Sequence, residues 1–194
     1  NILIVGVGGQ GNILAGKIIS QAFVAEGYDV KQSEVHGMAQ RGGAVSAHVR
    51  AGEKVYSPLV PEEEADYILS FEKLEILRYL NYASKKTHAL INDLELNPPS
   101  VSAGVQKYPD DVLGRVGKKT SKILVVDASG TARELGNERV VNSVLVGVLA
   151  AHLPLKDATW HKMYKAYVSP KLVDINLKAF EAGRKLCTDK VCFV

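Results

Sequence analysis

Hydrophobic residues in this 194-residue chain fall into short apolar runs that alternate with longer segments of helical periodicity. The apolar runs predict strands over residues 2–5, 29–33, 44–50, 65–71, 87–92 and 122–127. The helical spacing predicts helices over residues 13–25, 73–83, 137–154, 159–167 and 171–186. This alternation predicts an α/β fold, a Rossmann-like three-layer sandwich with a mostly parallel sheet, followed by a C-terminal helical extension.

Composition favours a single domain, with the sheet in residues 1–153 and the helical extension in residues 154–194. Hydrophobic residues make up 46% of the chain, enough for a substantial core. The net charge of +3 comes from scattered lysines and arginines, which gives no electrostatic case for nucleic acid. No apolar run approaches the roughly 20 residues needed to span a bilayer, and the chain opens on a strand. We therefore expect a cytoplasmic protein without membrane contact.

A glycine-rich turn follows the first apolar run. Gly6, Gly8, Gly9 and Gly11, with Gln10 among them, fit the pattern G-x-G-x-x-G between a predicted strand and a predicted helix. Such a turn directs backbone amides and the positive end of a helix dipole at one point, where phosphate or carboxylate is stabilised. The same glycines are also needed simply to bring a helix close to a strand, so the turn alone is a weak indication of ligand binding.

A second group of candidates lies in the loop over residues 33–43. Arg41 is a permanent cation suited to carboxylate or phosphate, and the glycines beside it allow successive amides to face one anion. His36 titrates near neutral pH and is the candidate catalytic residue. In the structural alternative, Arg41 pairs with Glu34 and His36 fills a surface gap. The candidate ligands here are Ser33, Glu34, Gln40, Arg41, Gly42 and Gly43.

A dinucleotide-binding enzyme is an alternative interpretation of these two segments. Glu34 stands where a ribose-binding acid would be expected after Gly11. However, a glycine-rich loop follows Glu34 in place of a crossover helix, and residues 44–50 alternate like a strand that closely follows its neighbour.

Polar residues later in the chain add four candidates. Asp127 and Ser129 follow a strongly apolar strand, and ligands gather at the carboxyl edge of parallel sheets, although a helix cap would explain them equally. Asn142 and Asn176 lie beside apolar helical faces, where an amide either binds a ligand or is satisfied within the structure.

The chain shows no self-contained catalytic motif. A serine nucleophile elbow, a Walker lysine and a zinc-binding His-Glu-x-x-His are all missing from the sequence. Its two cysteines, Cys187 and Cys192, are too few for a four-cysteine metal site. The two interpretations left for them are an adventitious pair and a reversible disulfide. An anion-binding α/β unit without a reactive group is typical of a subunit whose chemistry a partner completes.

The combined motifs resemble the small subunit of indolepyruvate:ferredoxin oxidoreductase and, more broadly, the gamma-type domain of the 2-oxoacid:acceptor (pyruvate/ketoisovalerate) oxidoreductases. The resemblance covers essentially the whole chain. It rests on IVGVGGQG (residues 4–11), SEVHGMAQRGG (residues 33–43), YSPL (residues 56–59) and residues 176–183. The HGMAQ segment before Arg-Gly-Gly is similar to the arylpyruvate branch.

The resemblance implies oxidative decarboxylation of a 2-oxoacid, such as indolepyruvate, to an acyl-coenzyme A, with electrons leaving to ferredoxin. It also implies that thiamine diphosphate and 4Fe-4S clusters reside on a large (alpha) partner subunit and that this chain alone binds no cofactor or metal. Coenzyme A would be the co-substrate.

The role implied for this chain is to line the substrate or coenzyme A approach and to dock the large subunit. Two further alternatives are a subunit that only docks and a homodimer of the isolated chain formed through a partner-facing surface.

Overall fold

The computed structural model describes residues 1–36 and 42–188 and is built on a six-stranded sheet with the order β2-β3-β1-β4-β5-β6. β1, β4, β5 and β6 are parallel, whereas β3 is antiparallel to both of its neighbours, β1 and β2. This confirms the mostly parallel sheet. The strands are β1 (Ile2–Val7), β2 (Asp29–His36), β3 (Ala44–Gly52), β4 (Tyr67–Ser70), β5 (His88–Asn92) and β6 (Ile123–Val126).

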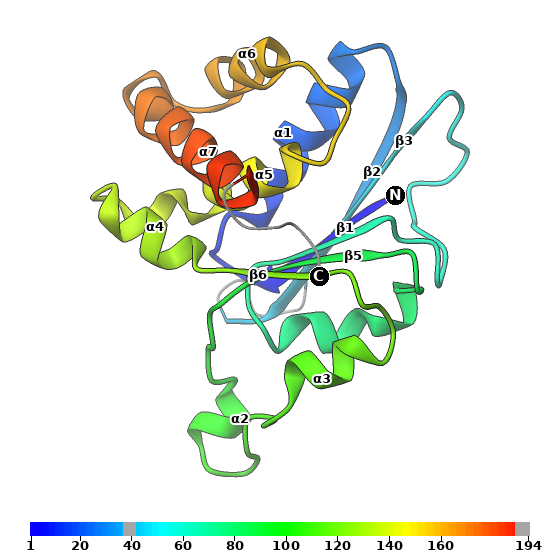
Figure 1. Cartoon of the computed structure of the whole chain (residues 1–194), viewed down its shortest axis with the longest axis vertical. Coiled ribbons are helices and arrows are strands. Elements are labelled where there is room, and N and C mark those ends of the chain that lie inside the picture. The colour runs from blue at the N-terminus through cyan, green and yellow to red at the C-terminus, as the bar shows by residue number, and fades with distance from the viewer. Residues whose placement is uncertain (37–41, 189–194) are drawn as a thin grey trace.

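Helices cover both faces of the sheet (Figure 1). One layer holds α1 (Asn12–Ala25), α4 (Ala128–Glu134), α5 (Val141–Ala150), α6 (Asp157–Tyr167) and α7 (Val173–Thr188). The other holds the 3-10 helix η1 (Glu75–Tyr82), α2 (Pro99–Ser102) and α3 (Val112–Gly117). Two short 3-10 turns, η2 (Glu138–Val140) and η3 (Pro170–Leu172), precede α5 and α7.

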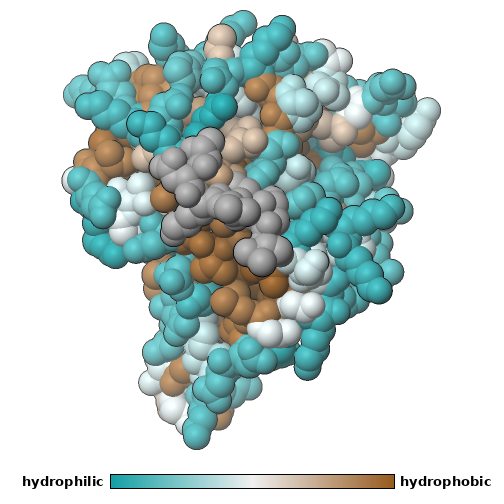
Figure 2. Space-filling view, viewed as in Figure 1, coloured by the Kyte–Doolittle hydropathy of each residue, from teal (hydrophilic) through white to brown (hydrophobic). Residues whose placement is uncertain are grey.

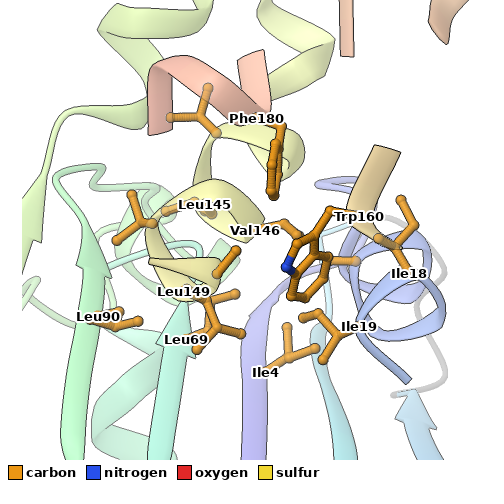
Figure 3. Close-up of a cluster of buried hydrophobic side chains, with 14 of the residues drawn as sticks. Ile4, Ile18, Ile19, Leu69, Leu90, Leu145, Val146, Leu149, Trp160 and Phe180 are labelled. Carbon is orange, nitrogen blue, oxygen red and sulfur yellow. The ribbon is translucent and has the colours of Figure 1, made fainter. Parts of the chain in front are cut away.

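The helical extension packs into the same core as the sheet. Trp160 of α6 and Phe180 of α7 are fully buried in one hydrophobic cluster with Ile4 of β1 and Ile19 of α1 (Figure 3). A second cluster on the opposite face contains Leu3 and other side chains of the sheet, η1 and α3. Burial of apolar surface against both faces therefore holds the three layers together.

Helices α5 and α7 cross at two glycines. A Cβ added to Gly183 would lie 2.8 Å from the carbonyl carbon of Val144, and one added to Gly147 would lie 2.9 Å from that of Phe180. Side chains at these positions would push the helices apart, so the close crossing depends on glycine.

The predicted helix over residues 73–83 is instead the 3-10 helix η1, with a break in helical geometry at Tyr79. Contacts at both ends fix this tighter winding. The buried carboxylate of Glu72 accepts a hydrogen bond from the Glu75 amide, and the carbonyl of Tyr82 accepts one from the Ala65 amide. One local and one tertiary hydrogen bond thus anchor the two ends of this 3-10 segment.

Candidate functional site

The glycine turn is braced by its own side chains at the carboxyl end of β1. Oε1 of Gln10 accepts a hydrogen bond from the Val7 amide at 2.7 Å, and its Nε2 donates to the Phe71 carbonyl at 3.3 Å. A Cβ on Gly6 would lie 2.7 Å from the same Oε1. The Gln10 side chain, a predicted ligand, therefore points back into the turn, and its amide ties β1 to the segment after β4.

Helix α1 begins at this turn with its first backbone amides uncapped. Gly11 is the N-cap residue, with φ +87°, and no side chain accepts a hydrogen bond from the first turn. The Asn142 amide packs so closely that a Cβ on Gly11 would lie 2.8 Å from its Nδ2. Gly11 is therefore required both by backbone conformation and by packing, and the amides it leaves open favour an anion.

A crevice of about 630 Å³ opens beside this helix end. The turn contributes Gly9, Gln10 and Gly11, and the apolar wall consists of Leu14, Leu94, Leu96 and Val141. The polar and charged lining consists of Ser129, Arg133, Glu138, Arg139 and Asn142. A neighbouring cavity of about 410 Å³ shares Leu14, Arg139 and Asn142 and reaches Asn176. The crevice lies outside the carboxyl ends of the parallel strands, where open α/β sheets bind ligands.

Asn92 holds together the strand ends that border the crevice. This fully buried residue donates from Nδ2 to the Phe71 carbonyl and to the Ser129 hydroxyl, each at 3.1 Å, and accepts from the Ala128 amide. The start of α4 is thereby fixed against β4 and β5. The Asp127 side chain caps α4 by accepting from the Gly130 amide, which is the capping alternative of the sequence analysis.

Two arginines give the crevice its positive charge. Arg133 lies on α4 and Arg139 on η2, and both are exposed at the crevice, where Glu138 is the single acidic side chain of the lining. Within residues 1–36 and 42–188, neither guanidinium forms an ion pair. Sequence reasoning missed both, although Arg133 follows the polar edge at Asp127 by less than two helical turns. The lining combines cationic groups, backbone amides and apolar surface, which suits an anionic organic ligand.

A buried carboxylate positions the apolar wall of the crevice. Oε1 of Glu72 accepts hydrogen bonds from the Leu96 amide at 3.0 Å and from the Tyr108 hydroxyl at 2.7 Å. Burial, together with this carboxylate, raises the pKa of the Tyr108 hydroxyl. Burial likewise raises the pKa of the neighbouring Glu75 carboxyl. The Glu72 contacts hold Leu96 in place and are distinct from the ligand-facing groups.

The structure brings together only some of the predicted site residues. Gly9, Gln10, Gly11, Ser129 and Asn142 line the crevice, and Asn176 lines the neighbouring cavity, where its side chain bonds to Ser143 and Leu172. Gly8 donates to the Gly43 carbonyl at 2.8 Å and Gly42 adjoins it, so the end of the loop lies beside the glycine turn. Gln40, Arg41, Cys192 and the side chain of His36 lie outside the described residues.

Ser33 and Glu34 lie elsewhere. They line a groove between β2 and α1, where Glu34 accepts a hydrogen bond from Gln32. Because β3 is inserted between β1 and β2, Glu34 is two strands away from the glycine turn, about 10 Å at the usual strand spacing. This strand order separates the acid from the turn and does not favour the dinucleotide-binding arrangement.

Two kinds of structural feature do not occur in the part of the chain that the structure describes. Over residues 1–36 and 42–188, no helix is long and apolar enough to cross a membrane. In the same part of the chain, no three His, Cys, Asp or Glu side chains are grouped as metal ligands.

Comparison with known proteins connects this geometry to a family. Residues 1–186 match the family described as pyruvate ferredoxin/flavodoxin oxidoreductase. The chain is 40% identical to indolepyruvate oxidoreductase subunit IorB of Archaeoglobus fulgidus over 187 residues, 94% of this chain and 92% of that protein.

Two solved structures share the fold. The gamma subunit of a keto/oxoacid ferredoxin oxidoreductase from Geobacter sulfurreducens superposes with a TM-score of 0.72 at 22% identity, over 97% of this chain and 98% of that one. The 2-oxoglutarate:ferredoxin oxidoreductase of Magnetococcus marinus gives a TM-score of 0.75 at 19% identity, over 98% of this chain and 31% of that one. The chain therefore belongs to the pyruvate ferredoxin/flavodoxin oxidoreductase family, as a gamma-type subunit of a 2-oxoacid:ferredoxin oxidoreductase.

Proposed function

We propose that this chain forms one wall of the substrate and coenzyme A site in an enzyme that converts an arylpyruvate, such as indolepyruvate, to an acyl-coenzyme A. The observation that carries the proposal is the crevice, where the uncapped end of α1 and two arginines face an apolar wall. A 2-oxoacid brings a carboxylate and coenzyme A brings phosphates, so each needs the cationic groups. The aromatic group of an arylpyruvate and the pantetheine chain of coenzyme A would each pack on the apolar wall.

The reaction balances only in a larger assembly. The 2-oxoacid loses carbon dioxide, its acyl group passes to the sulfur of coenzyme A with release of the thiol proton, and two electrons pass to ferredoxin. Thiamine diphosphate on the large subunit would supply the nucleophilic carbon for decarboxylation, and 4Fe-4S clusters there would carry the electrons. This chain would bind and orient anions and exclude water. The low-identity relative from Magnetococcus marinus is described with 2-oxoglutarate, coenzyme A and succinyl-coenzyme A bound, which supports the choice of ligands.

Docking of the large subunit would complete the site. Hydrophobic residues gather just below the centre of the face shown in Figure 2, with hydrophilic residues around them, as expected for a surface that another protein covers. Arg41 and His36 remain candidates from the sequence, for binding an anion and for orienting substrate or transferring a proton.

The test is kinetic and uses the chain co-expressed with its large subunit. Arg139→Ala and Arg133→Ala should each raise KM for coenzyme A or for indolepyruvate about tenfold, because a charge-assisted hydrogen bond contributes about 1.5 kcal/mol. Ferredoxin or viologen reduction is assayed anaerobically. The matched control is Arg115→Ala on α3, an exposed arginine outside the crevice lining.

Assembly of the complex separates the alternatives. If the crevice variants copurify with the large subunit and keep wild-type KM for both substrates, the crevice does not bind them. If they lose the large subunit and the remaining complex has normal kinetics, the crevice is a docking surface instead.

A further inference from the structure

Asn142 is a buried asparagine whose side-chain amide is only half used within the structure. It lies in the first turn of α5 and is 4% exposed. Its Oδ1 accepts a hydrogen bond from the Ser143 amide at 2.9 Å, which makes Nδ2 the other end of the side chain. Within residues 1–36 and 42–188, no group accepts a hydrogen bond from Nδ2. Buried polar groups normally have a partner, so this donor is unusual.

The polar neighbours of Asn142 are satisfied by the protein itself. The Ser143 hydroxyl donates to Oδ1 of Asn176 at 2.6 Å, and Nδ2 of Asn176 donates to the Leu172 carbonyl at 2.8 Å. These bonds join α5 to α7 and to the turn before it. Packing of the two helices therefore accounts for Ser143 and Asn176, and it does not account for Nδ2 of Asn142.

The open end of the Asn142 amide lies beside the start of α1. A Cβ on Gly11 would lie 2.8 Å from Nδ2, and both residues line the crevice. The backbone amides of residues 12–14, in the first turn of α1, likewise have no hydrogen-bond acceptor in the part of the chain that the structure describes. A side-chain donor and a helix end that are far apart in the sequence therefore meet at one side of the crevice.

This set of donors matches an oxyanion. Nδ2 carries two N–H groups and each backbone amide carries one, and none of these nitrogens accepts a hydrogen bond. A carboxylate or phosphate oxygen offers lone pairs alone, and the positive end of the α1 dipole stabilises its charge. The exposed Arg139 guanidinium of the same lining adds a full positive charge. A neutral ester or alcohol is a weaker acceptor without charge, so the site favours an ionised group.

We propose that Nδ2 of Asn142 and the first amides of α1 together bind the oxyanion of a substrate, either the carboxylate of the 2-oxoacid or a phosphate of coenzyme A. The inference rests on the proposed function, because it assigns one contact within that site. Backbone amides are the same in every sequence, so Asn142 is the specificity-determining residue of this contact and the one that a substitution can remove.

Two substitutions of Asn142 separate a binding role from a structural role, because the two roles predict opposite rankings. Asn142→Asp keeps the size of the side chain and the acceptor for the Ser143 amide, and an acid suits the first turn of a helix. It therefore disturbs the fold less, yet it replaces the donor by a charged acceptor. Asn142→Leu removes the donor without adding charge, but it also removes the acceptor for Ser143.

The assay is anaerobic reduction of ferredoxin or viologen by the complex with the large subunit. Asn142→Leu should raise KM for one of the two substrates about tenfold, and Asn142→Asp should raise the same KM about 100-fold, because charge repulsion is added to the lost hydrogen bond. A rise for coenzyme A assigns the oxyanion to a phosphate, and a rise for the 2-oxoacid assigns it to the carboxylate. The matched control is Asn81→Asp at an exposed position of η1, on the opposite face of the sheet, which should leave both KM values unchanged.

The ranking of the variants decides the outcome. The inference is wrong if Asn142→Leu raises KM more than Asn142→Asp, which is the structural order, or if both variants keep wild-type KM values. If Arg139→Ala and Arg133→Ala raise KM in the same assay, that failure leaves the proposed function intact; if they do not, the proposed function fails as well. Thermal melting of the complexes is measured alongside. Asn142→Asp should melt within about 4 °C of wild type, so its KM remains a valid test even if Asn142→Leu is unstable.

Discussion

Replacing glycine with alanine should have opposite effects on stability at two positions, Gly183 where α5 and α7 cross, and Gly117 in α3. In Gly183→Ala the new Cβ would lie 2.8 Å from the Val144 carbonyl carbon, whereas ordinary contact begins at 3.4 Å. The Val144 carbonyl oxygen would lie closer still, so the helices would have to separate by more than the 0.6 Å that the carbonyl carbon alone requires. At Gly117 in α3, a Cβ would meet nothing within 4 Å.

The two effects can be estimated. Overpacking of a filled core costs about 1–3 kcal/mol, and the obstacle at Gly183 is backbone, so we take about 3 kcal/mol. Alanine is favoured over glycine in a helix by about 1 kcal/mol, which leaves Gly183→Ala about 2 kcal/mol less stable. Gly117→Ala should raise the free energy of unfolding by up to about 1 kcal/mol, because the higher helix propensity of alanine is not opposed by a steric clash there.

Urea unfolding followed by circular dichroism provides the measurement. At about 2–4 °C per kcal/mol for a domain of this size, Gly183→Ala should also lower Tm by about 4–8 °C, and Gly117→Ala should raise it by up to about 4 °C. Equal stabilisation in both variants would refute the reasoning, because α5 and α7 would then have room for a side chain at the crossing.

Two further predictions concern buried polar groups. Burial lowers the pKa of His48, whose Nδ1 accepts a hydrogen bond from the Val60 amide. The neutral His48 side chain therefore stabilises the fold above the unfolded pKa near 6.5, and this stabilisation is lost as pH falls through the folded pKa. His48→Asn keeps an acceptor without this titration, so its Tm should fall less than that of wild type between pH 7 and pH 5, and an equal fall would contradict the assignment. Tyr108→Phe removes a hydrogen bond to the Glu72 carboxylate and should lower the free energy of unfolding in urea by about 2 kcal/mol. Tyr56→Phe, at a site 88% exposed, should change it by no more than about 0.5 kcal/mol. Similar values for the two variants would show that the Glu72 contact is not stabilising.

Local patterns determined much of this chain. The sequence predicts the β1 to α1 unit from the apolar run at residues 2–5, the glycine turn and the helical periodicity after it. This is possible because the hydrophobic periods of strands and helices can be recognised from neighbouring residues. The helices after residue 137 followed from the same periodicity, and the capping alternative for Asp127 followed from its place before a helix. The family was also recognisable in the sequence, because its turn and loop motifs are local.

Pairing between distant segments was decided only by the tertiary structure. Nothing local places β3 between β1 and β2, yet that order separates Glu34 from the glycine turn. Arg133 and Arg139 reach the crevice only because Asn92 and the sheet fix where α4 begins, and Gln10 points inward because its amide bonds to both the Val7 amide and the Phe71 carbonyl. Sequence periodicity specifies which face of an element is buried, whereas packing between elements far apart in the chain decides which residues meet.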